Sequence, residues 1–305
     1  MRDGMQGSKR YIIIHIDNLV FDLANYYLDL IDLVNETLVS NFGINKREFT
    51  DLLITHLKSS TKPTEDIISI AYQILQNSYN KKLEFPSTQS KNYFCNSIKV
   101  KFNNAKKSIL KLLPNSIQVL DFLKSEYFVI IGITNLSSTL ARTDLKLLGI
   151  DKYFDTVYTY EDSIKFHKKN STDLHNIWIN STLNTTSSTS CDIIELPPNI
   201  YKPSRRIVEK ILNDFDFKPL DAIMISRNME QDLLPAKLLG IKTVLIDTQI
   251  KIKNRSNLRI LLQNLGSKHL RTLLNLYNNK LISHEVKPGL ELKSMQYLTY
   301  ALTNK

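Results

Sequence analysis

Short apolar runs alternate with longer segments of helical periodicity along most of this chain. The runs "YIIIHI", "YFVIIGITN", "TVYTY", "AIMIS" and "TVLI" are rich in β-branched and aromatic residues and predict strands. Between them, apolar residues recur at helical spacing, as in 138–148 and 204–214. Strands that alternate with helices predict a parallel sheet covered on both faces. The predicted fold class is therefore α/β, with a Rossmann-like core.

The segment between the first and second predicted strands contains too many helices for one crossover connection. Helices are predicted at about 23–43, 46–57 and 64–77. We therefore expect a helical cap over 22–114, inserted after the first strand, and a core formed by 10–21 and 115–250. A polar tract at 163–199, which includes "NTTSSTS", predicts a surface insertion in that core. The remaining segment, 251–305, predicts a basic helical extension.

Composition excludes some classes of protein and leaves others open. The 305 residues can bury a sizeable core, and no apolar run approaches the ~20 residues of a membrane span. The start of the chain lacks the apolar core of a secretory signal. Cys95 and Cys191 fit no zinc spacing and have no accompanying pattern for a cysteine nucleophile. An intracellular, reducing compartment is expected, without a choice among cytoplasm, nucleus and organelle.

Positive charge is concentrated at the end of the chain. The net charge is +10, and 251–305 contains ten Lys and Arg residues against two Glu residues. A basic segment of this kind can bind nucleic acid or another anionic partner, although a solvated helical face has the same composition. The candidate contacts are Lys251, Lys253, Arg255, Arg259, Lys268 and Arg271.

Polar residues cluster where the predicted strands end. The residues are His15, Asp17, Asn18, Thr134, Asn135 and the segment from Ser226 to Asp232, with Lys202 ahead of a helix. Ligands of open parallel sheets bind at the carboxyl ends of the strands. A hydroxyl and a lysine can hold phosphoryl oxygens there, and carboxylates can hold a metal ion. The pattern therefore predicts a site of the phosphate-binding type.

In this order, these segments resemble the haloacid dehalogenase-like (HAD) superfamily, most of whose members are magnesium-dependent phosphohydrolases. "YIIIHIDNLVFD" stands in place of the first family motif, "VIIGITN" is similar to the second, and "YKPS" supplies the lysine. "LKLLGIDKYFDTVYTYED" and "AIMISRNMEQDLLPAKLLGIKTVLI" resemble later family segments. The resemblance covers most of residues 10–247 and implies a Rossmann-like core with a cap. It also implies phosphate binding by Thr134, Asn135 and Lys202.

The chain departs from the family pattern at the residues that carry its chemistry. The family nucleophile, the first Asp of the first motif, is replaced by His15, and the second Asp, the family's general acid and base, is retained as Asp17. The following Gly and Thr have become Asn18 and Leu19. In the fourth motif Asp232 remains as the second acid. Depending on a one-residue shift, the family's Gly-Asp pair is replaced by Ser226 and Arg227 or by Arg227 and Asn228.

These departures favour a catalytically inactive HAD-like protein that acts by binding, as a subunit of a protein or ribonucleoprotein assembly. No cofactor is expected, since both missing carboxylates face the same magnesium ion in the family, and Arg227 is a candidate to fill that cation's place. The alternative is an active phosphohydrolase on a small phosphorylated metabolite or nucleotide, with Mg²⁺ held by Asp17 and Asp232. A third reading is a sensor that binds a phosphorylated ligand through Thr134 and Lys202 without hydrolysis.

The role of each pocket residue has a functional and a structural interpretation. His15 is either a histidine packed at a strand end or an alternative nucleophile or ligand for a softer metal. Asp17 is either a proton donor or a carboxylate that satisfies loop amides. Asp232 is suited to a helix N-terminus as well as to a site.

Overall fold

A computed structural model describes most of the core and parts of the predicted cap and extension. The described residues are 9–42, 46–59, 100, 104–160, 189–197, 200, 202–247, 251–253, 255–265 and 287–303. The predicted helix at 64–77 lies outside them. No helix in these ranges is both long and apolar enough to cross a membrane.

The described core is built on a seven-stranded, fully parallel sheet with the order β4-β3-β2-β1-β5-β6-β7. The strands are β1 Tyr11–His15, β2 Val129–Ser137, β3 Thr156–Tyr160, β4 Asp192–Glu195, β5 Ala222–Ser226, β6 Lys242–Ile246 and β7 Leu290–Leu292. The predicted α/β class and Rossmann-like architecture are confirmed by this sheet and its helices.

β1 lies in the centre of the sheet because its side chains are apolar on both faces. Ile12 and Ile14 belong to the apolar cluster on one face, and Ile13 belongs to the cluster on the other. All three have 0% of their surface exposed. A strand buried on both faces is typical of a parallel sheet with a helical layer on each side.

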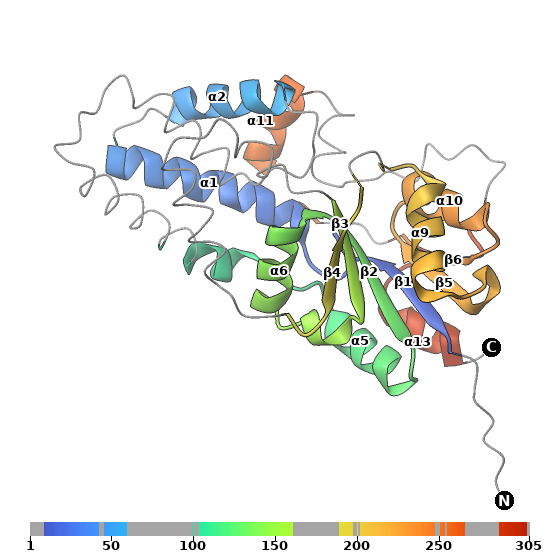
Figure 1. Ribbon diagram of the computed structural model, residues 1–305. Coiled ribbons are helices and arrows are strands. Elements are labelled where there is room, and N and C mark those ends of the chain that lie inside the picture. Colours follow the sequence, from blue (N-terminus) through green and yellow to red (C-terminus); the bar gives the residue numbers. More distant parts are fainter. Residues whose placement is uncertain are drawn as a thin grey trace, which may run out of the picture.

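Helices form those two layers. α5 Ser116–Ser125 and α6 Ser138–Leu147 cover one face, and α9 Arg205–Phe215 and α10 Leu234–Lys237 cover the other (Figure 1). Ser204 caps α9 by accepting a hydrogen bond from the Arg206 N–H at 3.2 Å. Such a cap satisfies one of the free N–H groups of the first turn, so the helix begins where the sequence predicts.

A second group of helices lies on the side to which β1 leads (Figure 1). It consists of α1 Leu23–Phe42, α2 Lys46–Ser59 and α11 Arg255–Leu265, which contact one another. The Asn25 side chain joins α1 to the chain ahead of α11, since its Nδ2 donates to the Lys251 carbonyl at 3.1 Å and its Oδ1 accepts from the Lys253 N–H at 2.9 Å. Part of the basic extension therefore packs on the helices of the predicted cap.

Two strands occur where the sequence predicts none. β4 lies within the tract expected to be a surface insertion, and β7 lies within the extension expected to be helical. Both are short, four and three residues, so an apolar pattern of period two has no room to develop. After β7, α13 Gln296–Thr303 packs on α5 and buries Leu298. The extension thus completes one edge of the described sheet.

A short helix at 104–109 and three short helical turns complete the described structure. The turns are the 3₁₀ turns η1 Asp151–Tyr153 and η2 Pro219–Asp221, and the π turn η3 Met229–Leu233. The π turn follows β5 directly and leads into α10. A π turn carries one residue more than an α turn, and this extra residue lies inside the segment whose motif spacing is ambiguous in the sequence.

Candidate functional site

The central strands bring the predicted pocket residues to one edge of the sheet. His15 ends β1 and lies in register with Ile133 of β2, while Ile14 lies in register with Ile225 of β5. Thr134 and Ser226 are the next residues on these neighbouring strands, so they lie beside the end of β1. The three side chains are buried, with 2%, 1% and 0% of His15, Thr134 and Ser226 exposed.

Asp17 is buried and accepts hydrogen bonds from the neighbouring strand. The Thr134 hydroxyl donates to Asp17 Oδ1 at 2.5 Å, and the Asn135 N–H donates to Oδ2 at 2.8 Å. Burial alone raises the pKa of Asp17, but the hydrogen bond and charge of His15 and the bonds from Thr134 and Asn135 outweigh it, so the pKa lies below its ordinary value. Asp17 is therefore held as a carboxylate.

His15 lies between two carboxylates. Its Nε2 is 3.5 Å from Asp17 Oδ2, and its Nδ1 is 3.1 Å from Asp232 Oδ2. Burial lowers the pKa of His15, but the charge of Asp232 and the close contacts with both carboxylates exceed this effect and raise the pKa above its ordinary value. An imidazole with a carboxylate at each nitrogen is stabilised in its doubly protonated form.

Asp232 has a second cation and a hydroxyl as partners. Lys202 Nζ is 2.8 Å from Asp232 Oδ1, and the Ser226 hydroxyl donates to Oδ2 at 2.6 Å. Burial raises the pKa of Asp232, but the charges of His15 and Lys202 lower it by more, so the pKa lies far below its ordinary value. Lys202, which the sequence assigns to phosphate binding, therefore forms an ion pair inside the protein.

Asn18 has a backbone role at a position with a left-handed φ angle. Its φ angle is 56°, in the left-handed region that favours glycine and tolerates asparagine. Its Oδ1 also accepts a hydrogen bond from the Ala24 N–H at 2.8 Å, at the start of α1. Asn18 thus forms the turn that leads from β1 into α1.

Arg227 lies beside this turn, away from the centre of the carboxylate pair. Its Nη1 donates to the Asn18 carbonyl at 3.3 Å. Burial lowers the pKa of Arg227 to about 10, and the charges of Asp247 and Asp22 oppose that shift. The side chain between Asp17 and Asp232 is His15, so the cation position that the sequence offers to Arg227 contains an imidazole.

The donor set does not fit magnesium. Each oxygen of the Asp17 and Asp232 carboxylates already contacts a hydroxyl, an amide, an imidazole or an ammonium group. Magnesium requires oxygen ligands in an octahedral arrangement, and neighbouring cations repel it. Among the described residues, no group of three or more His, Cys, Asp and Glu side chains is arranged to hold a metal ion.

The sequence places Ser226 and Asn228 at the strand-end site without indicating their contacts, and it does not single out Asp22 or Asp247. Ser226 lies at the strand end, and its hydroxyl donates to Asp232. The same Oγ accepts a hydrogen bond from the Asn228 N–H at 3.0 Å. The Asn228 side chain in turn caps the π turn by accepting from the Gln231 N–H at 3.1 Å. The strand-end position of Ser226 is visible in the sequence, whereas its hydrogen-bond partners depend on the fold.

The predicted anionic-partner residues are only partly described. Lys251, Lys253 and Arg259 are exposed around the start of α11. Arg255 is the first residue of α11, and Lys268 and Arg271 lie outside the described residues. The three exposed cations therefore lie on the segment that packs beside α1 and α2.

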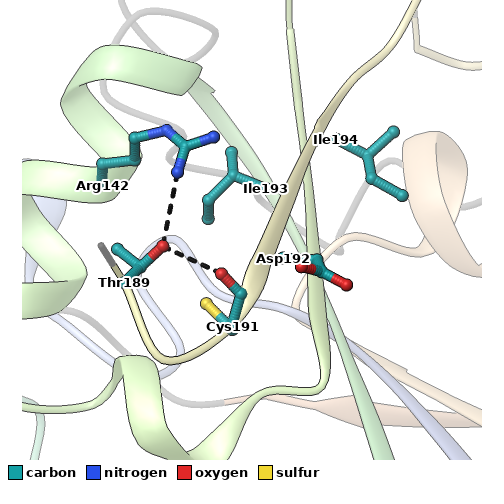
Figure 2. Close-up of a pocket in the computed structure, with 6 residues that line it drawn as sticks. All are labelled: Arg142, Thr189, Cys191, Asp192, Ile193 and Ile194. Carbon is teal, nitrogen blue, oxygen red and sulfur yellow. Dashed lines mark hydrogen bonds between the residues drawn. The ribbon is translucent and has the colours of Figure 1, made fainter.

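A surface pocket of about 460 Å³ lies away from the strand-end site, between α6 and β4 (Figure 2). Its lining residues are Arg142, Thr189, Cys191, Asp192, Ile193 and Ile194. The Arg142 guanidinium donates to the Thr189 hydroxyl at 3.4 Å, and that hydroxyl donates to the Cys191 carbonyl at 2.9 Å. Burial, followed by the charge of Asp151, raises the pKa of Cys191 to about 11, which disfavours a thiolate nucleophile.

Solved structures with similar architecture identify the fold. A 2-haloacid dehalogenase from Pseudomonas syringae pv. Tomato DC3000 aligns with a TM-score of 0.55 and 12% identity, covering 97% of this chain and 99% of that one. A HAD phosphatase from Thermococcus onnurineus aligns with a TM-score of 0.52 and 15% identity, covering 96% and 97%. This chain has the HAD-like fold.

The HAD-like fold is the extent of what these comparisons establish. No family model and no curated protein matches the sequence. At 12–15% identity, the two structures support the arrangement of strands and helices, which is the fold that the sequence motifs indicate. The chemistry of the pocket has to be argued from its own residues.

Proposed function

We propose that this HAD-like protein acts by binding and does not transfer phosphoryl groups. The observation that carries the proposal is the position of His15, which replaces the expected nucleophile and directs both ring nitrogens toward carboxylates. With both ring nitrogens facing carboxylates inside the protein, neither is directed toward the phosphorus atom of a substrate. This argues against a phosphohistidine as well as against the aspartyl phosphate that the family motif implies.

A phosphatase assay tests the catalytic half of this proposal. Purified protein is incubated with p-nitrophenyl phosphate and a panel of nucleotides, with and without Mg²⁺, beside the variants Asp17→Asn and His15→Asp/Arg227→Asp. We expect no turnover by the natural protein. Turnover in the double variant would support a disarmed pocket. Magnesium-dependent turnover by the natural protein that Asp17→Asn abolishes would contradict the proposal.

An active phosphohydrolase is the second candidate, because Asp17, Thr134, Lys202 and Asp232 converge at the same sheet edge. Against it, the Thr134 hydroxyl donates its proton to Asp17 and the Lys202 ammonium pairs with Asp232, so both groups already have partners inside the protein. The same contacts weigh against a phosphate sensor. A thermal shift in phosphate or nucleotides that Lys202→Ala removes would favour the sensor.

For the binding half, we propose a protein or ribonucleoprotein assembly as the setting and RNA as the first partner to test. The support is electrostatic: the net charge is +10, and Lys251, Lys253 and Arg259 are exposed around the start of α11. Phosphate neutralisation by such side chains produces affinity that falls steeply with salt. A folded surface near α1 and α2 would also position these cations against a rigid partner.

Fluorescence anisotropy with a labelled single-stranded RNA tests this partner. The variant Lys251→Glu/Lys253→Glu/Arg259→Glu is compared with Arg205→Glu/Arg206→Glu/Lys218→Glu, which makes the same charge change at exposed residues on and after α9. We expect the first variant alone to lose at least tenfold in affinity and to reduce the salt slope by about 2. Equal losses in both variants would point to a general charge effect and contradict a site near α11.

A further inference from the structure

We infer that the His15 imidazole occupies the position between Asp17 and Asp232 that a divalent metal would need, so that the natural pocket excludes the metal. This inference rests on the proposed function in one respect, the assignment of this edge of the sheet as the former family site. It also gives a physical cause for the loss of metal binding. The position between the two carboxylates is filled, in addition to there being fewer carboxylates.

The contacts of the two carboxylates support this inference directly. Both Asp17 Oδ2 and Asp232 Oδ2 face the same ring, at 3.5 and 3.1 Å from its two nitrogens. Magnesium requires oxygen ligands at about 2.0–2.1 Å. Two carboxylates spaced by an imidazole ring cannot approach one ion to that distance unless the ring leaves.

The remaining oxygens are also engaged. Asp17 Oδ1 accepts from Thr134, and Asp232 Oδ1 pairs with Lys202 at 2.8 Å. Asp17 and Asp232 have 1% and 2% of their surface exposed, so water cannot readily replace a lost partner. A metal would have to displace the imidazole and compete with the ammonium in the same buried volume.

Charge balance gives the arrangement its stability. When His15 is protonated, two carboxylates oppose one imidazolium and one ammonium, and the buried cluster of His15, Asp17, Lys202 and Asp232 then has no net charge. Buried charges are tolerated when they are paired and hydrogen-bonded. An added divalent cation would upset this balance, whereas replacing the histidine by an acid would leave a negative charge for the cation to neutralise.

Direct measurement of Mn²⁺ binding tests the inference without any substrate. Mn²⁺ is titrated into the natural protein, His15→Asp and His15→Asn, and the bound fraction is read by electron paramagnetic resonance. The matched control is Asn135→Asp, which adds a carboxylate to β2 beside Asp17 and retains His15. A His15→Asp/Asp232→Asn variant tests whether any gained metal uses Asp232.

We expect no saturable binding by the natural protein or by Asn135→Asp, and at least tenfold tighter binding by His15→Asp that the added Asp232→Asn change removes. If His15→Asp does not fold, His15→Asn is expected to show the same gain in weaker form. Saturable binding by the natural protein that Asp232→Asn removes would overturn the inference. A folded His15 variant that binds no better than the natural protein would overturn it as well.

These outcomes are separate from those of the phosphatase assay. Metal binding by the natural protein without turnover would overturn the inference that His15 occupies the metal position. It would leave the proposed binding function intact. Turnover by the natural protein without a metal would contradict the proposed binding function and leave the inference about His15 intact.

Discussion

His15 shows how one side chain can determine the character of a buried pocket. The His15 imidazole at the end of β1 lies between Asp17 and Asp232, so both carboxylates face a partner within the protein. Neither carboxylate is left as an isolated buried charge, which would cost far more than a paired one. The pocket is therefore organised by its own ion pairs.

The stability of the network depends on pH from both sides. Because the pKa of His15 is raised in the folded protein, His15 contributes fully to the free energy of unfolding below the ordinary imidazole pKa of ~6.5. This contribution is lost as pH rises through the pKa of His15 in the folded protein. The lowered pKa values of Asp17 and Asp232 make their contributions complete above ~4 and lost as pH falls. The network is therefore expected to stabilise the fold most between about pH 4.5 and 6.

Urea unfolding of the natural protein and of His15→Gln, from pH 4 to 9, measures this dependence. The difference in free energy of unfolding between the two proteins is expected to shrink as pH rises above ~6.5. A difference that stays constant over this range would mean that His15 does not change its protonation on unfolding.

The sequence was sufficient to locate these residues but not to assign their contacts. Strand ends and motif order predict that Asp17, Thr134, Lys202 and Asp232 meet, and the structure brings them together. The orientation of the His15 ring depends on side-chain packing, and so does the direction of the Arg227 side chain toward Asn18. Linear spacing carries no information on such packing, and the π turn after β5 further obscures the register of the fourth motif.

Between elements, a buried ion pair joins the helix at 104–109 to α6. Lys106 pairs with Asp144, and the two residues have 4% and 1% of their surface exposed. The Lys106 ammonium also lies 5.8 Å from the centre of the Tyr26 ring in α1. Lys106 therefore contacts both a core helix and a helix of the predicted cap.

Breaking this pair on one side is expected to be costly. Lys106→Met leaves a buried carboxylate without its counterion and should lower the free energy of unfolding by about 3–5 kcal/mol. The double variant Lys106→Met/Asp144→Leu removes both charges and should recover most of that loss. Urea denaturation of the two single variants and the double variant measures the coupling. Losses that simply add would show that the pair is not energetically linked.

The element boundaries that the sequence predicts best are those with a local chemical signal. α6 ends close to Gly149, whose φ angle of 66° favours glycine, and α9 begins after the Ser204 cap. β4 and β7 lack such a signal, since each is a short run whose strand character depends on pairing with β3 or β6. Edge pairing is a tertiary effect, and local propensity is a weak guide to it.

Across the whole molecule, burial decreases from the centre of the sheet to its described edges. The five residues of β1 are all buried, whereas β4 and β7 contain no buried residue. Local opening is least costly where few apolar contacts are broken. The described sheet is therefore expected to open from its edges while its centre stays closed.

Hydrogen exchange followed by mass spectrometry or NMR tests this gradient. Amides of β1 and of the neighbouring parts of β2 and β5 are expected to exchange only through global unfolding, at least about 100-fold more slowly than those of β4 and β7. Similar exchange rates at the centre and the edges would show instead that the sheet opens as a single unit.

The central position of β1 also affects how the protein is made. The neighbours of Tyr11–His15 are Val129–Ser137 and Ala222–Ser226, so the ribosome must add more than 100 residues before the first partner strand exists. At translation rates of about 5–20 residues per second, this interval lasts roughly 6 to 23 seconds. During that time one of the most apolar strands of the protein is without its sheet. Protection of the nascent chain by a chaperone would be most valuable in this window.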